Sequence, residues 1–153
     1  MKPMKLLVTG GLGFIGSNFI RYYLEKSESD VEIINVDAMK YGSNPDNLKE
    51  IDGSNYNYTF VKGDISDYQL MSDLVKDVDA IVNFAAETHV DRSISGPEAF
   101  FKSNVLGVFT ILEAIRKRNP EAIFVQVSTD EVYGDIINGS FTENDALRPS
   151  SPY

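Results

Sequence analysis

Two features of this sequence predict an α/β fold built on a doubly wound parallel sheet. Short apolar runs alternate with amphipathic stretches along the chain, as in parallel sheets covered by helices on both faces. A glycine-rich turn also joins the first apolar run to the first amphipathic stretch. Because crossovers between parallel strands are right-handed, we expect the strand order 3-2-1-4-5.

Each expected strand is a short run rich in apolar, β-branched or aromatic residues, which favour strands. The runs cover residues 6–9, 31–36, 58–61, 80–86 and 123–127. The fourth is nearly continuous in apolar residues, as in strands buried on both faces. Sheets of this class usually continue to a sixth strand, so we expect this sheet to be incomplete on its C-terminal side.

Helices are expected where apolar residues recur at spacings of three and four. These stretches cover residues 14–26, 67–75 and 97–118, whereas the polar residues 41–52 favour a loop with a short helix. Ser66 is the expected N-cap of the second stretch. The expected buried face of the third consists of Phe101, Val105, Val108, Leu112 and Ile115.

Composition limits the possible functions. A chain of 153 residues with 42% hydrophobic residues is expected to form one domain over residues 1–153. The net charge of −9 argues against nucleic acid as a partner, and the absence of cysteine excludes disulfides and thiolate metal sites. With a single histidine, we expect no metal site. The sequence has no long apolar segment, so we expect a cytoplasmic protein that binds no membrane.

The glycine turn predicts a site for a dinucleotide. Gly10, Gly13 and Gly16 follow the first strand, and Phe14 and Ile15 begin the first helix. Backbone N–H groups and the helix dipole at such a turn attract a diphosphate, and glycines allow its close approach. The alternative interpretation is an ordinary glycine-rich strand–helix turn.

Carboxylates follow the second and third strands. Asp37 lies 21 residues after Gly16, where a carboxylate accepts the adenosine-ribose hydroxyls and repels a 2′-phosphate, which favours NAD over NADP. Lys40 lies nearby and is a candidate phosphate ligand. Asp64, followed by Ile65, is a candidate acceptor for the adenine amino group, although a capping or turn role fits equally well.

The segment that leaves the fourth strand is expected at the same edge of the sheet. Phe84 is followed by Ala85 and Ala86, whose small side chains allow a flat ligand to approach the backbone. His89 is interpreted as a solvated or hydrogen-bonded loop residue. Arg92 is a candidate contact to a diphosphate or to a partner subunit, and a surface role is equally consistent.

Two adjacent carboxylates, Asp130 and Glu131, follow the fifth strand. A helical turn beginning at Ser128 would let both border one pocket, where the substrate is expected. The spacing from Ser128 to Glu131 also fits a capping box, which would give these residues a structural role. Both roles are compatible.

The sequence resembles the extended short-chain dehydrogenase/reductase superfamily and, within it, the dTDP-glucose 4,6-dehydratases. The turn from Thr9 to Gly16 and the Asn-Val-x-Gly segment at residues 104–107 are shared widely in the superfamily. The runs Ala-Ala-Glu-Thr-His-Val-Asp-Arg-Ser at residues 85–93 and Ser-Thr-Asp-Glu-Val-Tyr-Gly at residues 128–134 are more specific. The C-terminal Pro-Ser-Ser-Pro-Tyr completes the pattern.

The resemblance implies NAD as cofactor and a dehydration that yields a 4-keto-6-deoxy sugar. Tyr153 would remove the C4 hydroxyl proton and Thr129 would bond the C4 oxygen. Glu131 would take the C5 proton, while Asp130 would protonate the departing C6 hydroxyl. The resemblance also implies that Ser103 contacts the cofactor and that Thr88 and Thr129 contact the substrate.

The resemblance further implies a homodimer and a C-terminal sugar-nucleotide-binding portion, which these 153 residues do not contain. They also do not contain the lysine expected four residues after Tyr153, so we expect these residues alone to be inactive. Another NAD-dependent nucleotide-sugar enzyme, such as a UDP-glucose 4-epimerase or a related 4,6-dehydratase, is the first alternative. A non-catalytic dinucleotide-binding module is the second.

Overall fold

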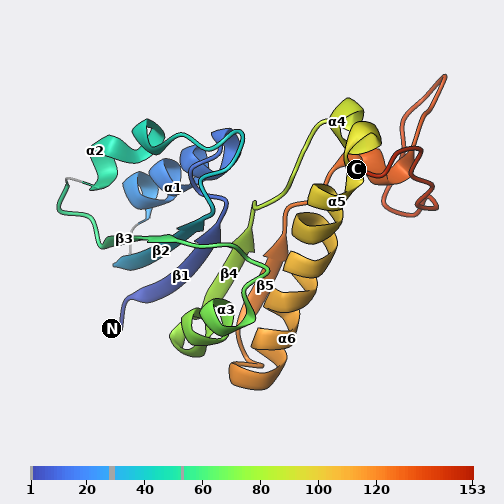
Figure 1. Ribbon diagram of the computed structural model, residues 1–153. Coiled ribbons are helices and arrows are strands. Elements are labelled where there is room, and N and C mark those ends of the chain that lie inside the picture. The colour runs from blue at the N-terminus through green and yellow to red at the C-terminus, as the bar shows by residue number, and fades with distance from the viewer. Residues whose placement is uncertain (1, 28–29, 53) are drawn as a thin grey trace.

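The computed structural model describes residues 2–27, 30–52 and 54–153. One five-stranded parallel sheet has the order β3-β2-β1-β4-β5, which confirms the predicted topology (Figure 1). The strands are β1 (Met4–Thr9), β2 (Val31–Asp37), β3 (Tyr58–Lys62), β4 (Ala80–Asn83) and β5 (Ile123–Gln126).

Helices cover both faces of this sheet, as Figure 1 shows. The α-helices are α1 (Phe14–Lys26), α2 (Lys49–Asp52), α3 (Tyr68–Leu74), α4 (Val90–Ser95), α5 (Pro97–Phe100) and α6 (Val108–Arg118). A π-helical segment, Phe101–Gly107, joins α5 to α6. Shorter 3-10 turns span Pro45–Leu48, Val75–Asp77 and Asp130–Tyr133. None of the helices in the described ranges is long and apolar enough to cross a membrane.

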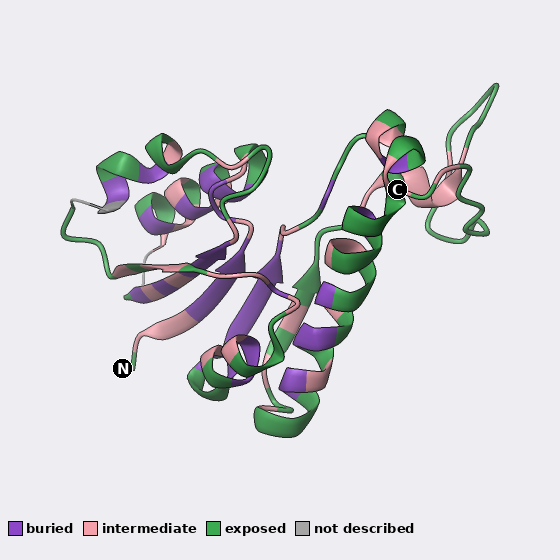
Figure 2. Cartoon of the chain, viewed as in Figure 1, coloured by how far each residue is buried: buried purple, intermediate pink, exposed green. Residues whose placement is uncertain are grey.

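Strand β1 lies at the centre of the sheet and contributes to a core on each face. Leu6 and Val8 pack with Ile20 of α1, whereas Leu7 packs with Ile111 of α6. This division follows from the strand period of two, which turns successive side chains to opposite faces. Figure 2 shows the resulting buried layer between the helices.

Strand β4 is shorter than predicted. It ends at Asn83, and the Asn83 side chain holds the residues that follow, since its Oδ1 accepts the N–H of Ala85 at 3.2 Å. The apolar run continues through Phe84, Ala85 and Ala86, and these residues form the wall of a cleft instead. Apolar character alone does not separate a strand from the loop that follows it.

The predicted cap of α3 was one residue too early. Oδ1 of Asp67, not Ser66, accepts the N–H of Leu70 at 3.1 Å. Ser66 is bound by the preceding turn, because its N–H and its hydroxyl donate to Oδ1 of Asp64 at 3.0 and 2.9 Å. The shared acceptor keeps Ser66 outside the helix.

The predicted buried face of the long helix was mostly wrong. Phe101, Val105 and Leu112 are exposed and Val108 is half-buried, whereas Ile115 is buried as expected. The buried stripe has the same helical spacing as the predicted one but begins one residue earlier, because Phe100 and not Phe101 is buried. The face that packs on the sheet includes Phe100, Gly107, Ile111, Ala114 and Ile115.

Candidate functional site

A cleft of about 360 Å³ lies at the carboxyl ends of the strands. This is where ligands bind to open α/β sheets. All residues expected to contact the cofactor line it: Gly10, Gly13, Phe14, Ile15, Gly16, Asp37, Lys40, Asp64, Ile65, Phe84, Ala85, Ala86 and Ser103. Thr88 and Tyr153 line the same cleft.

The glycine turn is tightly packed on one side and open on the other. Gly10 has φ +72°, and a Cβ there would lie 2.5 Å from the Ala85 nitrogen. A Cβ on Gly16 would lie 2.4 Å from the carbonyl oxygen of Gly10, whereas one on Gly13 would come no closer than 3.4 Å to that oxygen. Gly10 and Gly16 are therefore required by packing, and Gly13 faces the space a ligand would occupy.

The first turn of α1 has no side-chain cap. Gly13 is the N-cap residue and supplies no capping oxygen. Phe14 and Ile15 are exposed at the cleft, with 81% and 62% of their surface accessible. The first N–H groups of a helix have no partner within it and attract anions. This helix end therefore fits the diphosphate of a dinucleotide.

Asp37 is buried beside the glycine turn and is held by three donors. Its Oδ2 accepts the N–H of Leu12 at 3.0 Å. Its Oδ1 accepts the N–H of Met39 at 2.8 Å and the hydroxyl of Ser43 at 2.6 Å. A carboxylate offers about four lone-pair positions, so one on Oδ2 remains for a ligand. The three hydrogen bonds thus fix the Asp37 carboxylate in place and leave one acceptor position on Oδ2 for a ligand.

Asp64 performs the turn role that the sequence left open. Its Oδ1 holds Ser66, and its Oδ2 lies 2.8 Å from Lys40 Nζ and 3.9 Å from Lys102 Nζ. Partial burial raises the pKa of this carboxyl, but the hydrogen bonds from Lys40 and Ser66 outweigh burial and lower it to about 2. Asp64 is therefore ionised and paired at neutral pH.

The loop after β4 is held by Asn104 of the π-helical segment. The N–H of Glu87 donates to Asn104 Oδ1 at 2.8 Å, and Asn104 Nδ2 donates to the Glu87 carbonyl at 2.9 Å. Ser103, the neighbour of Asn104, lines the cleft. The segment thus fixes the loop that carries Thr88 and supplies a wall residue.

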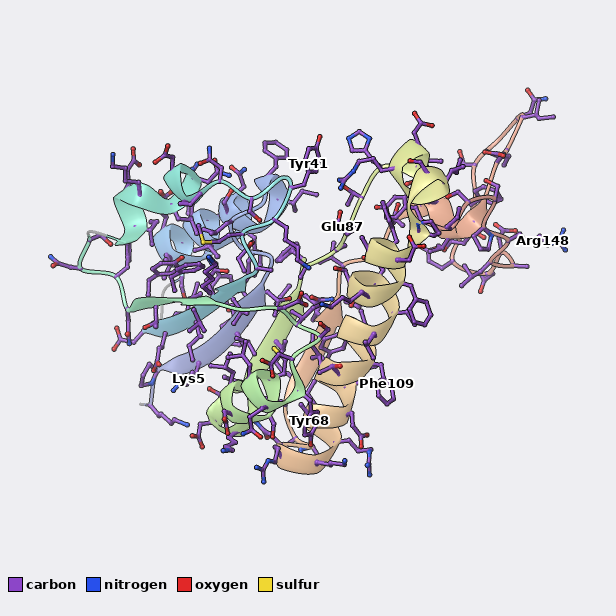
Figure 3. All side chains as sticks on the ribbon, in the orientation of Figure 1. Lys5, Tyr41, Tyr68, Glu87, Phe109 and Arg148 are labelled. Carbon is purple, nitrogen blue, oxygen red and sulfur yellow. The ribbon has the colours of Figure 1, made fainter. Side chains whose placement is uncertain are left out.

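Tyr41 and Glu87 come from the loops after β2 and β4 and line the cleft (Figure 3). Arg92 links them, because it lies 4.2 Å from the Tyr41 ring centroid and 3.3 Å from Glu87 Oε2. His89 has φ +91° and places its ring 6.4 Å from that of Tyr41. Arg92 thus contacts residues of this chain, and His89 remains a loop residue in a ring contact.

The capping box predicted at Ser128 is not formed. Thr129 is the N-cap, and its Oγ1 accepts the N–H of Glu131 at 3.3 Å. Ser128 lines the cleft, whereas Thr129, Asp130 and Glu131 lie beyond its lining. Because the N-cap is Thr129 and not Ser128, the Glu131 side chain is not the capping partner. Asp130 is exposed, and Glu131 is half-buried.

Tyr153 reaches the cleft from the end of a long return segment. Gly134, with φ +80°, turns the chain after the 3-10 turn, and Arg148 donates its N–H to the Val132 carbonyl at 3.0 Å. The Tyr153 ring then packs 6.1 Å from the ring of Phe100. Residues far apart in sequence therefore bring the phenol to the same cleft as the glycine turn.

Several lining residues were not predicted to belong to the site. They share positions in the loops that directly follow strands: Ala38, Tyr41, Gly42, Ser43, Gly63, Glu87, Val127 and Ser128. The strand order alone is a sufficient signal for such positions, because all carboxyl ends meet at one edge of the sheet.

Comparison with known proteins agrees with this geometry. A family model described as GDP-mannose 4,6 dehydratase matches residues 7–153. The chain is 52% identical over 150 residues to the low-salt glycan biosynthesis protein Agl12 of Haloferax volcanii, covering 98% of this chain and 47% of that protein. It is 46% identical over 158 residues to dTDP-glucose 4,6-dehydratase of Xanthomonas campestris, covering 96% and 44%.

A similar solved structure is DesIV, a dTDP-glucose 4,6-dehydratase from Streptomyces venezuelae with NAD and TYD bound. The TM-score is 0.90 and the identity is 46%, over 98% of this chain and 47% of that one. The chain thus spans about half the length of the relatives it matches. From the match over residues 7–153, this chain belongs to the GDP-mannose 4,6-dehydratase family.

Proposed function

We propose that this chain is the cofactor-binding part of an NAD-dependent dTDP-glucose 4,6-dehydratase. The observation that carries the proposal is the presence of Tyr153 in the same cleft as the glycine turn. A module that only binds a dinucleotide needs no phenol there. The similarity to enzymes of that name, some solved with NAD, supports the same conclusion.

The residues that line the cleft have the chemical groups that NAD requires. The uncapped first turn of α1 suits the diphosphate, and Gly13 leaves room for it. The free position on Asp37 Oδ2 suits an adenosine-ribose hydroxyl, and Asp64 and Ile65 border the place of the adenine. Phe84, Ala85, Ala86 and Ser103 line the remaining wall.

Bound NAD would supply the hydride acceptor for C4 of the sugar and, once reduced, the hydride donor for C6. Tyr153 would remove the C4 hydroxyl proton as the hydride leaves C4, and Thr129 would donate a hydrogen bond to the C4 oxygen. The resulting ketone acidifies the C5 proton, which Glu131 takes. Asp130, in its protonated form, gives a proton to the departing C6 hydroxyl, and Thr88 holds the substrate.

The position of Glu131 supports its assignment as a base. The cap of the 3-10 turn comes from Thr129, so the Glu131 carboxylate is not required for capping. Asp130 and Glu131 follow Ser128, which does line the cleft, by only two and three residues. A sugar that extends from the cleft past Ser128 would meet both carboxylates.

Product analysis tests the reaction. The protein expressed from its complete gene is incubated with dTDP-glucose, and the product is examined by mass spectrometry. We expect a 4-keto-6-deoxy sugar nucleotide, lighter than the substrate by one water. A product of unchanged mass would indicate an epimerase, and the absence of any product alongside NAD binding would indicate a non-catalytic module. Either result overturns the proposal.

We also propose that two copies pair through the outer face of the long helix. Its exposed apolar residues are Phe101, Val105, Phe109 and Leu112, which recur at spacings of four, four and three. Figure 3 shows Phe109 on the side of α6 that is turned away from the sheet. Burying such a stripe is a common basis for association between helices. Analytical ultracentrifugation tests this proposal. We expect the unsubstituted protein to sediment as a dimer and the Phe109→Lys variant to sediment as a monomer.

A further inference from the structure

The adenosine end of the cleft contains an ion pair that the proposed reaction does not use. Lys40 Nζ lies 2.8 Å from Asp64 Oδ2, and both residues line the cleft. Lys40 is the sole lysine or arginine among the described lining residues, which also include three carboxylates, Asp37, Asp64 and Glu87. The question is therefore what this one cation does beside a site that suits NAD.

The position of Lys40 is set by the loop after β2. Asp37 Oδ1 accepts the N–H of Met39, which adopts a left-handed conformation with φ +55°. This turn sends Lys40 toward the end of the neighbouring strand β3, where Asp64 follows Lys62 and Gly63. The two strands are paired from Ile33 with Tyr58 to Asp37 with Lys62, so the partners meet at one edge.

Lys40 and Asp37 would have opposite effects on the binding of a 2′-phosphate. A lysine at the adenosine ribose would attract such a group, whereas the buried Asp37 carboxylate would repel it. Asp64 removes this conflict, because its carboxylate neutralises the Lys40 ammonium group in the ion pair. The lowered pKa of Asp64 is consistent with a carboxylate that stays charged in this pair.

We propose that Asp64 is a specificity-determining residue, which holds Lys40 in an ion pair and so prevents it from binding the 2′-phosphate of NADP. This inference rests on the proposed function, since it assumes that the adenosine of a dinucleotide lies at Asp37. It assigns the preference for NAD to two carboxylates with different tasks. Asp37 repels the phosphate, and Asp64 withholds the cation that would otherwise bind it.

Substitution of Asp64 by Asn tests the proposal. Asn keeps an oxygen that can accept the N–H and hydroxyl of Ser66, so the turn is retained, but it removes the charge. Affinities for NAD and NADP are measured by calorimetric titration of the protein expressed from its complete gene. We expect the preference for NAD over NADP to fall by about tenfold in Asp64→Asn, which corresponds to about 1.4 kcal/mol.

Two double variants separate the proposed role from a general charge effect. Lys40→Met in the Asp64→Asn background should restore the preference for NAD, because the released cation is gone. Lys102→Met is the matched control, since Lys102 Nζ also approaches Asp64 Oδ2, at 3.9 Å, but does not line the cleft. We expect it to leave the relaxed preference of Asp64→Asn in place.

An unchanged preference in Asp64→Asn, or equal effects of the two lysine substitutions, would overturn the proposal. Circular dichroism verifies folding, and Asp64→Ser, which also keeps an oxygen acceptor, replaces Asp64→Asn if that variant does not fold. Failure of the unsubstituted chain to bind NAD is a different result. It would contradict the proposed function itself. NAD binding with a preference over NADP that does not change in Asp64→Asn would contradict only the role of Asp64.

Discussion

The guanidinium carbon of Arg92 lies 4.2 Å from the centroid of the Tyr41 ring. Tyr41 belongs to the loop after β2 and lines the cleft, while Arg92 belongs to α4 and is paired with the buried Glu87. The contact thus joins the two sides of the cleft at its rim. We therefore expect this contact to slow the release of a ligand from the cleft.

The first prediction concerns this contact. Tyr41→Ala should raise the dissociation rate of NAD several-fold, because an exposed cation–π contact contributes about 0.5–1 kcal/mol. Tyr41→Phe keeps the ring and is the matched control, with a rate close to that of the unsubstituted chain. Stopped-flow fluorescence measures both. Equal rates in the Ala and Phe variants would show that the ring does not retain the ligand.

The glycines of the turn should differ in their effects. Gly16→Ala places a Cβ 2.4 Å from a backbone oxygen, so we expect it to destabilise the fold by about 1–3 kcal/mol. Gly13→Ala has room for its methyl group, so we expect a loss of stability below about 1 kcal/mol together with weaker NAD binding. Urea unfolding measures the stability of both variants, and titration with NAD measures their affinity for the cofactor. A large loss of stability in Gly13→Ala would contradict its assignment to the ligand.

The pH dependence of stability should reflect Asp64. Its pKa falls from 3.8 to about 2 on folding, despite the opposing effect of burial, because Lys40 and Ser66 bond the charged form. A lowered pKa stabilises the fold above the unfolded value, and this contribution is lost as pH falls through the folded value. Between pH 4 and 2, Asp64→Asn should therefore lose less stability than the unsubstituted chain.

Thermal unfolding at several pH values within that range measures the effect, with Asp46→Asn, in an exposed 3-10 turn, as the control. Parallel losses in all three proteins would show that Asp64 does not contribute to acid sensitivity. The comparison is informative only in this range, since above it the Asp64 carboxyl is ionised in both the folded and the unfolded state.

The two carboxylates after β5 should act after the oxidation step. In the protein from the complete gene, Glu131→Gln should suppress exchange of the C5 hydrogen with solvent while hydride transfer to NAD persists. Asp130→Asn should slow the loss of water. Proton NMR in deuterated water and absorbance of the reduced cofactor measure these steps. A variant that only lost folding stability would indicate a structural role instead.

Local sequence patterns predicted the sheet and many of the residues that line the cleft. The strand order follows from alternation and handedness, and it places Asp37, Asp64 and Ala85 at one edge although they are distant in sequence. Sequence patterns were less informative where either of two neighbouring residues could cap a helix. Whether Ser66 or Asp67 caps α3 depends on which oxygen Ser66 already bonds, and this is a property of the folded turn.

Contacts between segments that are far apart in the chain also could not be predicted from local sequence patterns. The stripe of the long helix that packs on the sheet begins at Phe100 rather than Phe101, and helical spacing alone does not distinguish two apolar stripes that lie one residue apart. Likewise, the pairing of Lys40 with Asp64 depends on the left-handed backbone of Met39. A local sequence reading identified Lys40 as a cation near the site and left its partner open.

The most direct measurement of the central claim is a calorimetric titration of the protein expressed from its complete gene with NAD and with NADP. The account predicts saturable binding of one NAD, at least about tenfold tighter than NADP, which corresponds to about 1.4 kcal/mol. It also predicts that Gly13→Ala weakens this binding while the chain remains folded. A folded chain that binds no NAD, or that binds NADP as tightly as NAD, would contradict the account.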